Sequence, residues 1–243
     1  MSILEAEGIT KHFGGLTALS GIGFHVDQGE ILGLIGPNGA GKTTLFGLIS
    51  AALPPDRGVI RFKGEIITSL KPHQVCRRGV ARTFQSVKVF PNMSVLANVM
   101  VGSFFGRPNT VSAAAAEGEA VELLEFVGLS VFAAIPARDL TLANQKMLEV
   151  ARALATGPEL LLLDELMAGL NPTEIGLAMD LVTRIRDRGI TVFMIEHVMK
   201  AIMSVCERIM VLHHGEKIAE GTPKEIASSK TVVEVYLGES AYA

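Results

Sequence analysis

The residues best suited to chemistry form a glycine-rich segment near the start of the chain. Residues 36–44 read G-P-N-G-A-G-K-T-T, the pattern of a phosphate-binding loop, between apolar runs at 31–35 and 45–49. Glycine lets the backbone approach a phosphate closely, lysine adds a point charge, and a threonine hydroxyl at this place ligates Mg²⁺. A plain glycine-rich turn is the alternative, but a strand before and a helix after are what phosphate binding requires. We therefore predict a nucleotide site made by Gly36, Pro37, Asn38, Gly39, Ala40, Gly41, Lys42, Thr43 and Thr44.

Two acids follow an apolar run later in the chain. Residues 160–163 are four leucines, and Asp164 and Glu165 come next. The run is typical of a central parallel strand, and ligands of open α/β sheets bind at the carboxyl ends of such strands. Beside a phosphate loop, Asp164 fits the acid that holds Mg²⁺, and Glu165 is placed to polarise a water. The alternative is that both acids simply cap the strand.

Three further residues have both a catalytic and a structural interpretation. Phe13 follows the first predicted strand on a glycine-flanked segment, where it either stacks on an adenine or is an ordinary buried phenylalanine. Gln85, at the end of a buried strand, either caps that strand or reaches a metal or the attacking water. His197, after the strand at 190–195, either caps a helix or senses a γ-phosphate. Spacing alone does not decide between these alternatives.

Composition narrows the class of protein. The 243 residues carry a formal net charge of −3, which gives no general attraction to nucleic acid or to an anionic membrane. The two cysteines, Cys76 and Cys206, are far apart without metal-binding spacing, and the first residues lack the pattern of a signal peptide, so we expect a reducing cytoplasm. No apolar run reaches the about 18 residues that a membrane helix needs. His213 and His214 are expected to be exposed turn residues.

The elements that must position these residues alternate strands with helices. We predict a small antiparallel sheet leading into the loop, from strands at 3–9 and 21–26, and a strand at 30–35 before it. After the loop we predict a helix at 43–52, a hairpin at 59–67, a short helix and a strand at 79–84. Beyond the helical section we predict a helix at 174–188, and then strand 190–195, helix 198–206, strands 208–212 and 217–219, and helix 224–228.

The section from 91 to 155 changes character. Helical spacing at 95–101, an alanine- and glutamate-rich stretch at 113–127, and a third helix at 148–155 indicate an inserted helical subdomain. No linker separates it from the rest. We therefore expect one domain, with a core at 1–88 and 156–243 and a helical subdomain at about 89–155.

Taken in order, these features resemble the ATPase subunit of ABC transporters. Within that family, R-T-F-Q at 82–85, A-G-L-N-P-T-E at 168–174, I-E-H at 195–197 and V-Y-L-G at 235–238 are similar to the importer ATPases for branched-chain amino acids. The resemblance implies an α/β fold: a P-loop NTPase core with a mostly parallel sheet, an N-terminal antiparallel β-subdomain and the helical insert. It also implies that Phe13 stacks on adenine, Gln85 contacts Mg²⁺ and water, Glu165 is the general base, Asn171 lies in a loop that crosses a dimer, and His197 holds the γ-phosphate.

The chain departs from the family at its signature. The Leu-Ser-Gly-Gly-Gln segment should fall just before the last helix of the insert, where residues 140–145 read L-T-L-A-N-Q. Thr141 keeps a hydroxyl and Ala143 keeps a backbone N–H, so we expect both at a phosphate. Either Ala143 tolerates the backbone angles of a glycine, or this signature binds nucleotide poorly and its site is slow. Leu166 replaces the usual proline after Glu165, which removes a rigid φ there.

The resemblance also implies partners and a place. The ligands are ATP and Mg²⁺. The partners are a second ATPase subunit in a homo- or heterodimer, integral membrane permease subunits and, indirectly, a periplasmic solute-binding protein. The chain itself is expected at the cytoplasmic face of the inner or plasma membrane. Val89, Phe90 and Met93 are expected at the permease, unless they are buried in the insert. The alternatives are a lipid-exporting ATPase, a soluble ABC ATPase without a transport role, and a small-molecule kinase. The transported solute is not readable from these residues.

Overall fold

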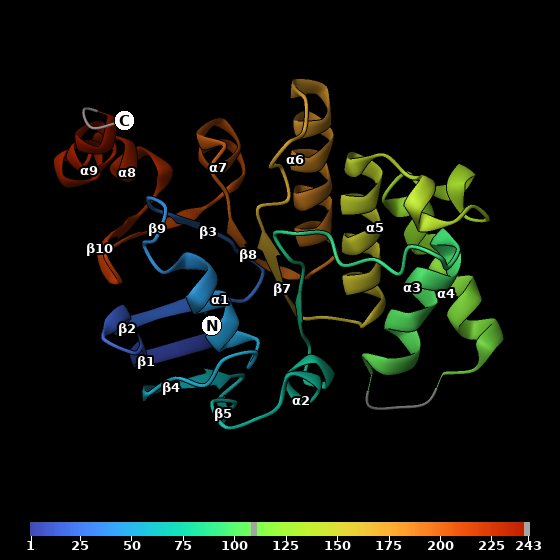
Figure 1. The fold of residues 1–243 in the computed structure, drawn as a ribbon, viewed down its shortest axis with the longest axis horizontal. Coiled ribbons are helices and arrows are strands. Elements are labelled where there is room, and N and C mark those ends of the chain that lie inside the picture. The colour runs from blue at the N-terminus through green and yellow to red at the C-terminus, as the bar shows by residue number, and fades with distance from the viewer. Residues whose placement is uncertain (108–110, 241–243) are drawn as a thin grey trace.

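The computed structural model describes residues 1–107 and 111–240. Its first sheet is antiparallel, in the order β2-β1-β4-β5, and lies at the lower left of Figure 1. Its strands are β1 (Ser2–Phe13), β2 (Leu16–Asp27), β4 (Arg57–Phe62) and β5 (Glu65–Ile66).

The first two strands are longer than the alternation of apolar residues predicts. The register between β1 and β2 shifts between Ala6 and Ile9, and Gly8 there has a φ of 61°. A bulge of this kind inserts a residue and lets a strand continue with its alternation reset. Phe13 is therefore the last residue of β1, and the expectation that it follows the strand is wrong.

The second sheet holds the nucleotide-binding pattern. Its order is β10-β9-β3-β8-β7-β6, and every pairing except β9 with β10 is parallel. This confirms the predicted fold class, a mostly parallel core beside an antiparallel sheet. The strands are β3 (Ile31–Ile35), β6 (Val80–Arg82), β7 (Leu160–Asp164), β8 (Thr191–Ile195), β9 (Arg208–His213) and β10 (Glu216–Gly221).

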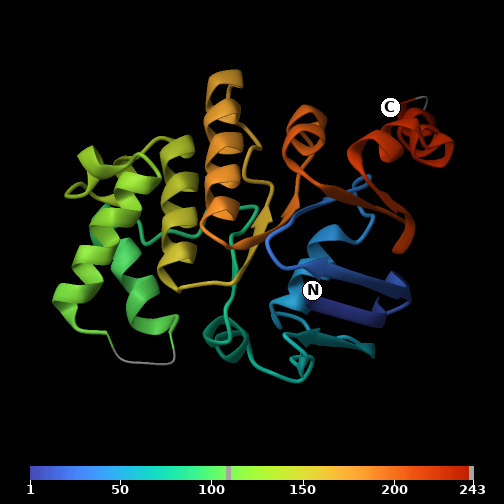
Figure 2. The ribbon, with the colours of Figure 1, turned by 180° about the vertical axis from the view of Figure 1, so that it is seen from behind.

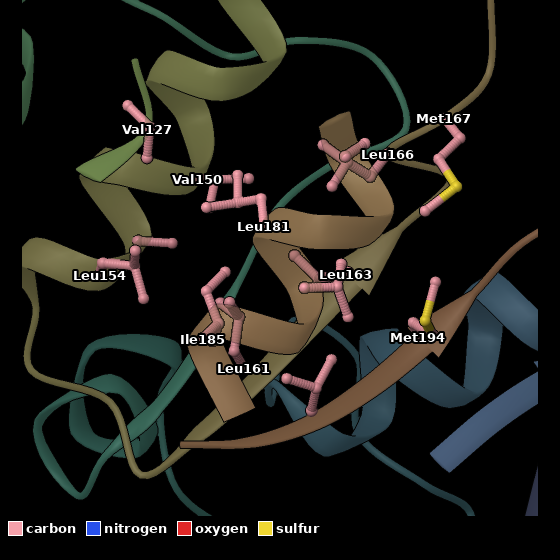
Figure 3. Packing of buried hydrophobic residues seen from close by; sticks show 14 of the residues in the cluster. Val127, Val150, Leu154, Leu161, Leu163, Leu166, Met167, Leu181, Ile185 and Met194 are labelled. Carbon is pink, nitrogen blue, oxygen red and sulfur yellow. The ribbon is translucent and has the colours of Figure 1, made fainter. Parts of the chain in front are cut away.

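Hydrophobic cores cover both faces of this sheet, which explains why its central strands are apolar almost throughout. In β7, Leu161 and Leu163 face one cluster, whereas Leu160 and Leu162 face the other. The first cluster joins the sheet to α5 (Leu142–Ala155) and α6 (Pro172–Asp187), as the packing in Figure 3 shows. The second joins it to α1 (Lys42–Ile49) and the antiparallel sheet.

The helical section is grouped at one end of the molecule. It contains α3 (Val95–Phe105), α4 (Ala113–Phe126) and α5, and two short 3₁₀ turns precede α5. Ser94, Ser112 and Thr141 cap these helices, each accepting a hydrogen bond from a backbone N–H of the first turn. Figure 2 shows α6 between this group and α7 (Met199–Val205). The division at residues 89 and 155 stays a prediction.

Other elements differ from expectation at their ends. The strand predicted at 79–84 is shorter, and α2 (Pro72–Arg77) precedes it. After β10 come α8 (Pro223–Ser228) and α9 (Lys230–Ser240), of which α9 was not predicted. Within the described parts of the chain, no helix is both long enough and apolar enough to cross a membrane.

Candidate functional site

The phosphate loop joins β3 to α1. Gly36, Gly39 and Gly41 all have positive φ, at 152°, 79° and 101°. At Gly36 even a methyl group is excluded, because a Cβ atom would lie 2.1 Å from the carbonyl oxygen of Leu212. Gly41 is the N-cap residue of α1 and has no side chain to cover the first backbone N–H groups. The start of this helix is therefore suited to an anion.

Lys42 holds the loop from inside. Its side chain is buried, and Nζ donates hydrogen bonds to the carbonyl oxygens of Gly36 at 2.5 Å and Pro37 at 2.8 Å. These two bonds fold the ammonium group against the loop that the sequence predicts to surround phosphates. The positive charge of Lys42 therefore lies against the loop itself.

A cavity of about 690 Å³ opens over the loop. The predicted residues Phe13, Gln85 and Glu165 line it together with loop residues 38–44. Phe13 is 47% exposed, so part of its ring is available to a planar ligand. The sequence analysis missed the remaining lining residues, which are Leu16, Thr17, Ala18 and His214.

These missed residues lie next to predicted ones. Leu16 pairs with Phe13 across the turn between β1 and β2. Gly14 and Gly15 are a local signal for the turn of this hairpin, which the shorter predicted strands left out. His214 is exposed in the turn that the sequence predicts, whereas His213 is the last residue of β9 and is half-buried, so the expectation of an exposed turn residue is wrong for His213. Nothing in the local sequence marks His214 as a lining residue.

Glu165 meets two other predicted residues directly. Gln85 Nε2 donates to Glu165 Oε2 at 2.9 Å, and His197 Nε2 lies 2.8 Å from Glu165 Oε1. The three residues follow β6, β7 and β8, which are neighbours in the sheet. Parallel strands bring their carboxyl ends to one edge, and this places the three side chains together. Glu165 itself is 9% exposed and lies in the left-handed region, with a φ of 52°.

Asp164 points to a different environment. Its Oδ2 is bound by Arg82 Nη2 at 2.8 Å, and its backbone N–H donates to Thr83 Oγ1 at 3.1 Å. Burial raises the pKa of the Asp164 carboxyl, and the Arg82 guanidinium opposes this shift. Among the described residues, Oδ1 is buried with no hydrogen-bond partner. Arg82 thus fixes Oδ2, whereas Oδ1 can accept a hydrogen bond or bind a metal ion.

The predicted signature residues lie elsewhere. Neither Thr141 nor Ala143 lines the cavity over the phosphate loop. The helix expected at 148–155 begins at Leu142, so the expectation that the signature precedes it is wrong. Thr141 is the N-cap residue, and its Oγ1 accepts from the N–H of Asn144 at 3.3 Å. Ala143 is in the first helical turn, where alanine is favourable, and so a glycine conformation is not required of it.

Asn171 also lies outside the cavity over the phosphate loop, like Thr141 and Ala143. It is the N-cap residue of α6, where Oδ1 accepts from the N–H groups of Thr173 and Glu174, both at 3.0 Å. Nearby, a Cβ at Gly169 would lie 3.4 Å from Leu142 Cδ2, so the loop before α6 packs on the start of α5. The predicted nucleotide-binding residues therefore form two groups. Phe13 and loop residues 38–44 line the cavity, whereas Thr141, Ala143 and Asn171 do not.

Comparison with known proteins gives concordant matches. Residues 19–168 match the family model of the ABC transporter, and residues 216–242 match that of the branched-chain amino acid ATP-binding cassette transporter. The chain is 39% identical to the high-affinity branched-chain amino acid transport ATP-binding protein BraF of Pseudomonas aeruginosa, over 98% of each chain.

Solved structures agree with these matches. An ATP-binding cassette of an ABC transporter in its ADP conformation superposes with a TM-score of 0.89 at 32% identity, covering 98% of this chain and 99% of that one. A bacterial ABC transporter cassette solved as a dimer gives a TM-score of 0.83 at 25% identity, covering 90% and 98%.

Proposed function

The chain belongs to the ABC transporter family as an ATP-binding and ATP-hydrolysing subunit, and from this premise we propose that it powers the import of branched-chain amino acids. The observation that carries the proposal is the likeness to BraF over 98% of the chain, together with the separate match of residues 216–242 to the branched-chain family. The subunit acts at the cytoplasmic face of the membrane, where it is bound to permease subunits. A periplasmic solute-binding protein delivers the amino acid to them.

In this proposal the cavity over the phosphate loop holds ATP. Phe13 stacks on the adenine, and the loop N–H groups and Lys42 bind the phosphates. Glu165 takes a proton from the attacking water, and Gln85 and His197, which contact its two oxygens, orient that carboxylate and the γ-phosphate. The low exposure of Glu165 supports this role, since bulk water competes little for its hydrogen bonds.

The residues present fit a magnesium ion. Thr43 and Gln85 line the cavity, and the unpartnered, buried Oδ1 of Asp164 is an oxygen donor of the kind that Mg²⁺ prefers. We propose that Thr43, Gln85 and Asp164 hold it, directly or through water. When bound, Mg²⁺ neutralises charge on the β- and γ-phosphates.

We propose that each complete nucleotide site combines residues of two subunits. Thr141, Ala143 and Asn171 lie outside the cavity that holds Lys42, so we propose that they contact nucleotide in the partner of a dimer. The dimeric cassette that this chain resembles supports that arrangement.

The permease contact is proposed at the groove between the sheet and the helical section. Phe90 and Met93, predicted for this contact, are 44% and 36% exposed, whereas Val89 packs against the core. Arg152, whose guanidinium lies over the Phe90 ring, lines a mostly apolar cavity of about 330 Å³ together with Phe84 and Phe105, among others. Exposed aromatic residues at a groove are typical of a protein interface.

Transport in vesicles tests the proposal. The chain, its permease subunits and its binding protein are reconstituted together, and uptake of labelled leucine is measured with ATP inside or outside. Leucine uptake that requires ATP on the side of this subunit is expected. ATP hydrolysis that responds to a different solute class, with no leucine uptake, would contradict the substrate assignment and leave the ATPase in place.

A further inference from the structure

A buried lysine contacts the backbone next to Glu165. Lys146 belongs to α5, its side chain is 5% exposed, and Nζ donates to the carbonyl oxygens of Glu165 at 2.9 Å and Leu166 at 3.0 Å. Both carbonyls belong to the turn that leaves β7. A charged donor makes these hydrogen bonds stronger than those of a neutral one.

That turn has an uncommon backbone conformation. Glu165 has a φ of 52°, which a residue with a side chain adopts only where its surroundings fix it. Its N–H donates to Ile195 O at 2.9 Å, and its carbonyl oxygen also accepts from the N–H of Ala168 at 3.2 Å. Lys146 adds the side-chain bonds from a separate helix. It is therefore one of the groups that determine where the Glu165 carboxylate lies.

Packing alone does not explain a lysine here. Burial lowers the pKa of Lys146, and the carboxylates of Glu196, Glu149 and Glu165 oppose this shift. A methionine would fill similar space without the cost of desolvating a charge. The ammonium group donates hydrogen bonds to two backbone carbonyl groups, which a methionine side chain cannot do.

The position of Lys146 on its helix gives the contact a second consequence. Thr141 caps the start of α5, and Lys146 lies just over one turn further along. The same short helix therefore carries the residues proposed to contact the partner's nucleotide and the cation that holds this chain's own catalytic turn.

We propose that Lys146 is a positioning residue for ATP hydrolysis, which fixes the Glu165–Leu166 turn and ties its placement to the start of α5. This rests on the proposed function, because Glu165 is the base only in that proposal. Lys146 does not line the cavity that is proposed to hold ATP. Its removal should therefore lower the rate of the chemical step and leave ATP affinity nearly unchanged.

Four variants of the reconstituted complex test this role. Lys146→Met removes the donor at similar length, Lys146→Arg keeps a charged donor, Met147→Leu changes the next residue of α5 conservatively, and Glu165→Gln removes the base. Single-turnover hydrolysis and the affinity for a fluorescent ATP analogue are measured for each. We expect Lys146→Met to lower the rate roughly ten- to hundredfold with affinity within about twofold, since a small misplacement costs that much. Lys146→Arg should restore most of the rate, and Met147→Leu should match the wild type.

The double variant Lys146→Met with Glu165→Gln separates positioning from a general loss of structure. If Lys146 acts through Glu165, the double variant should hydrolyse ATP no more slowly than Glu165→Gln alone. Rate losses that multiply would overturn the proposal, as would a Lys146→Met enzyme of normal rate beside an inactive Glu165→Gln enzyme. Where Lys146→Met does not fold, Lys146→Gln takes its place. A fully active Glu165→Gln enzyme would instead overturn the role of Glu165, and with it the need to position it.

Discussion

His197 Nε2 lies 2.8 Å from Glu165 Oε1, so the residues that follow β8 and β7 meet across two neighbouring strands. Gln85 binds the other oxygen of the same carboxylate. Each oxygen of Glu165 thus lies within hydrogen-bonding distance of a residue that is proposed to contact phosphate or metal. Each carboxylate oxygen can accept a second hydrogen bond, so a water can approach Glu165 beside Gln85 and His197, and the orientation of the carboxylate depends on what these two residues bind.

The first prediction concerns Glu165 as the base. Glu165→Gln should lower ATP hydrolysis by at least about a hundredfold, because general-base catalysis contributes about that much or more. ATP affinity should remain, since the loop N–H groups and Lys42, which are proposed to bind the phosphates, are unchanged. Single-turnover hydrolysis and nucleotide titration check both. Glu159→Gln, at the amino end of the same strand, is the matched control and should be fully active. Equal rates for the two variants would exclude Glu165 as the base.

The second prediction concerns Lys42. Lys42→Ala should weaken ATP affinity by roughly tenfold or more, because a charge-assisted contact to phosphate contributes about 1.5–3 kcal/mol. A fluorescent nucleotide titration measures this. Lys63→Ala removes an exposed lysine that pairs with Glu159 and should bind ATP normally. Unchanged affinity in Lys42→Ala would mean that the loop binds phosphate through its backbone alone.

The third prediction compares two glycines of the loop. Gly36→Ala places Cβ 2.1 Å from Leu212 O, whereas at Gly39 no atom lies within 4 Å of the added Cβ. Gly39→Ala should therefore lower the free energy of unfolding by about 1 kcal/mol, the cost of left-handed backbone. Gly36→Ala should lower it by about 3 kcal/mol or more, because backbone must move. Urea unfolding checks the order, and equal losses would contradict the close approach of the loop to β9.

The fourth prediction concerns pH. Burial raises the pKa of Glu196 from 4.5 to about 7, and hydrogen bonds from backbone N–H groups and the charge of Lys146 oppose this. A carboxyl with a raised pKa in the folded state contributes most to stability below pH 4.5, and this contribution is lost as pH rises through about 7. Glu196→Gln has no such titration, and its amide oxygen can still accept from Met167 N. Its stability relative to the wild type should therefore increase between pH 5 and pH 8, by up to about 3 kcal/mol.

Thermal unfolding across this pH range measures the difference between Glu196→Gln and the wild type. Glu122→Gln, on an exposed position of α4, is the control and should run parallel to the wild type. A constant offset between Glu196→Gln and the wild type would show that the carboxyl titrates at its ordinary pKa in the folded protein.

Local patterns predicted most of the elements. The phosphate loop was readable because its glycines, lysine and threonine each meet a requirement set by neighbours in the chain. The strand before Asp164 was readable because four consecutive leucines fit a sheet covered on both faces. Two errors came from local signals given too little weight. Thr141 is a good N-cap residue that marks the true start of α5. Gly8 marks a bulge within β1, which continues beyond the predicted end at Ile9.

By itself, the sequence determined which residue types were available for ATP chemistry and that they follow strands and begin helices. The tertiary structure decided which of them meet. Gln85, Glu165 and His197 are far apart in the chain and converge because β6, β7 and β8 are adjacent in the sheet, an order that no local pattern encodes. The same holds for Arg82 on Asp164 and for Lys146 on the turn after β7. Such contacts depend on how strands pair and helices pack over long separations, so only the folded chain reveals them.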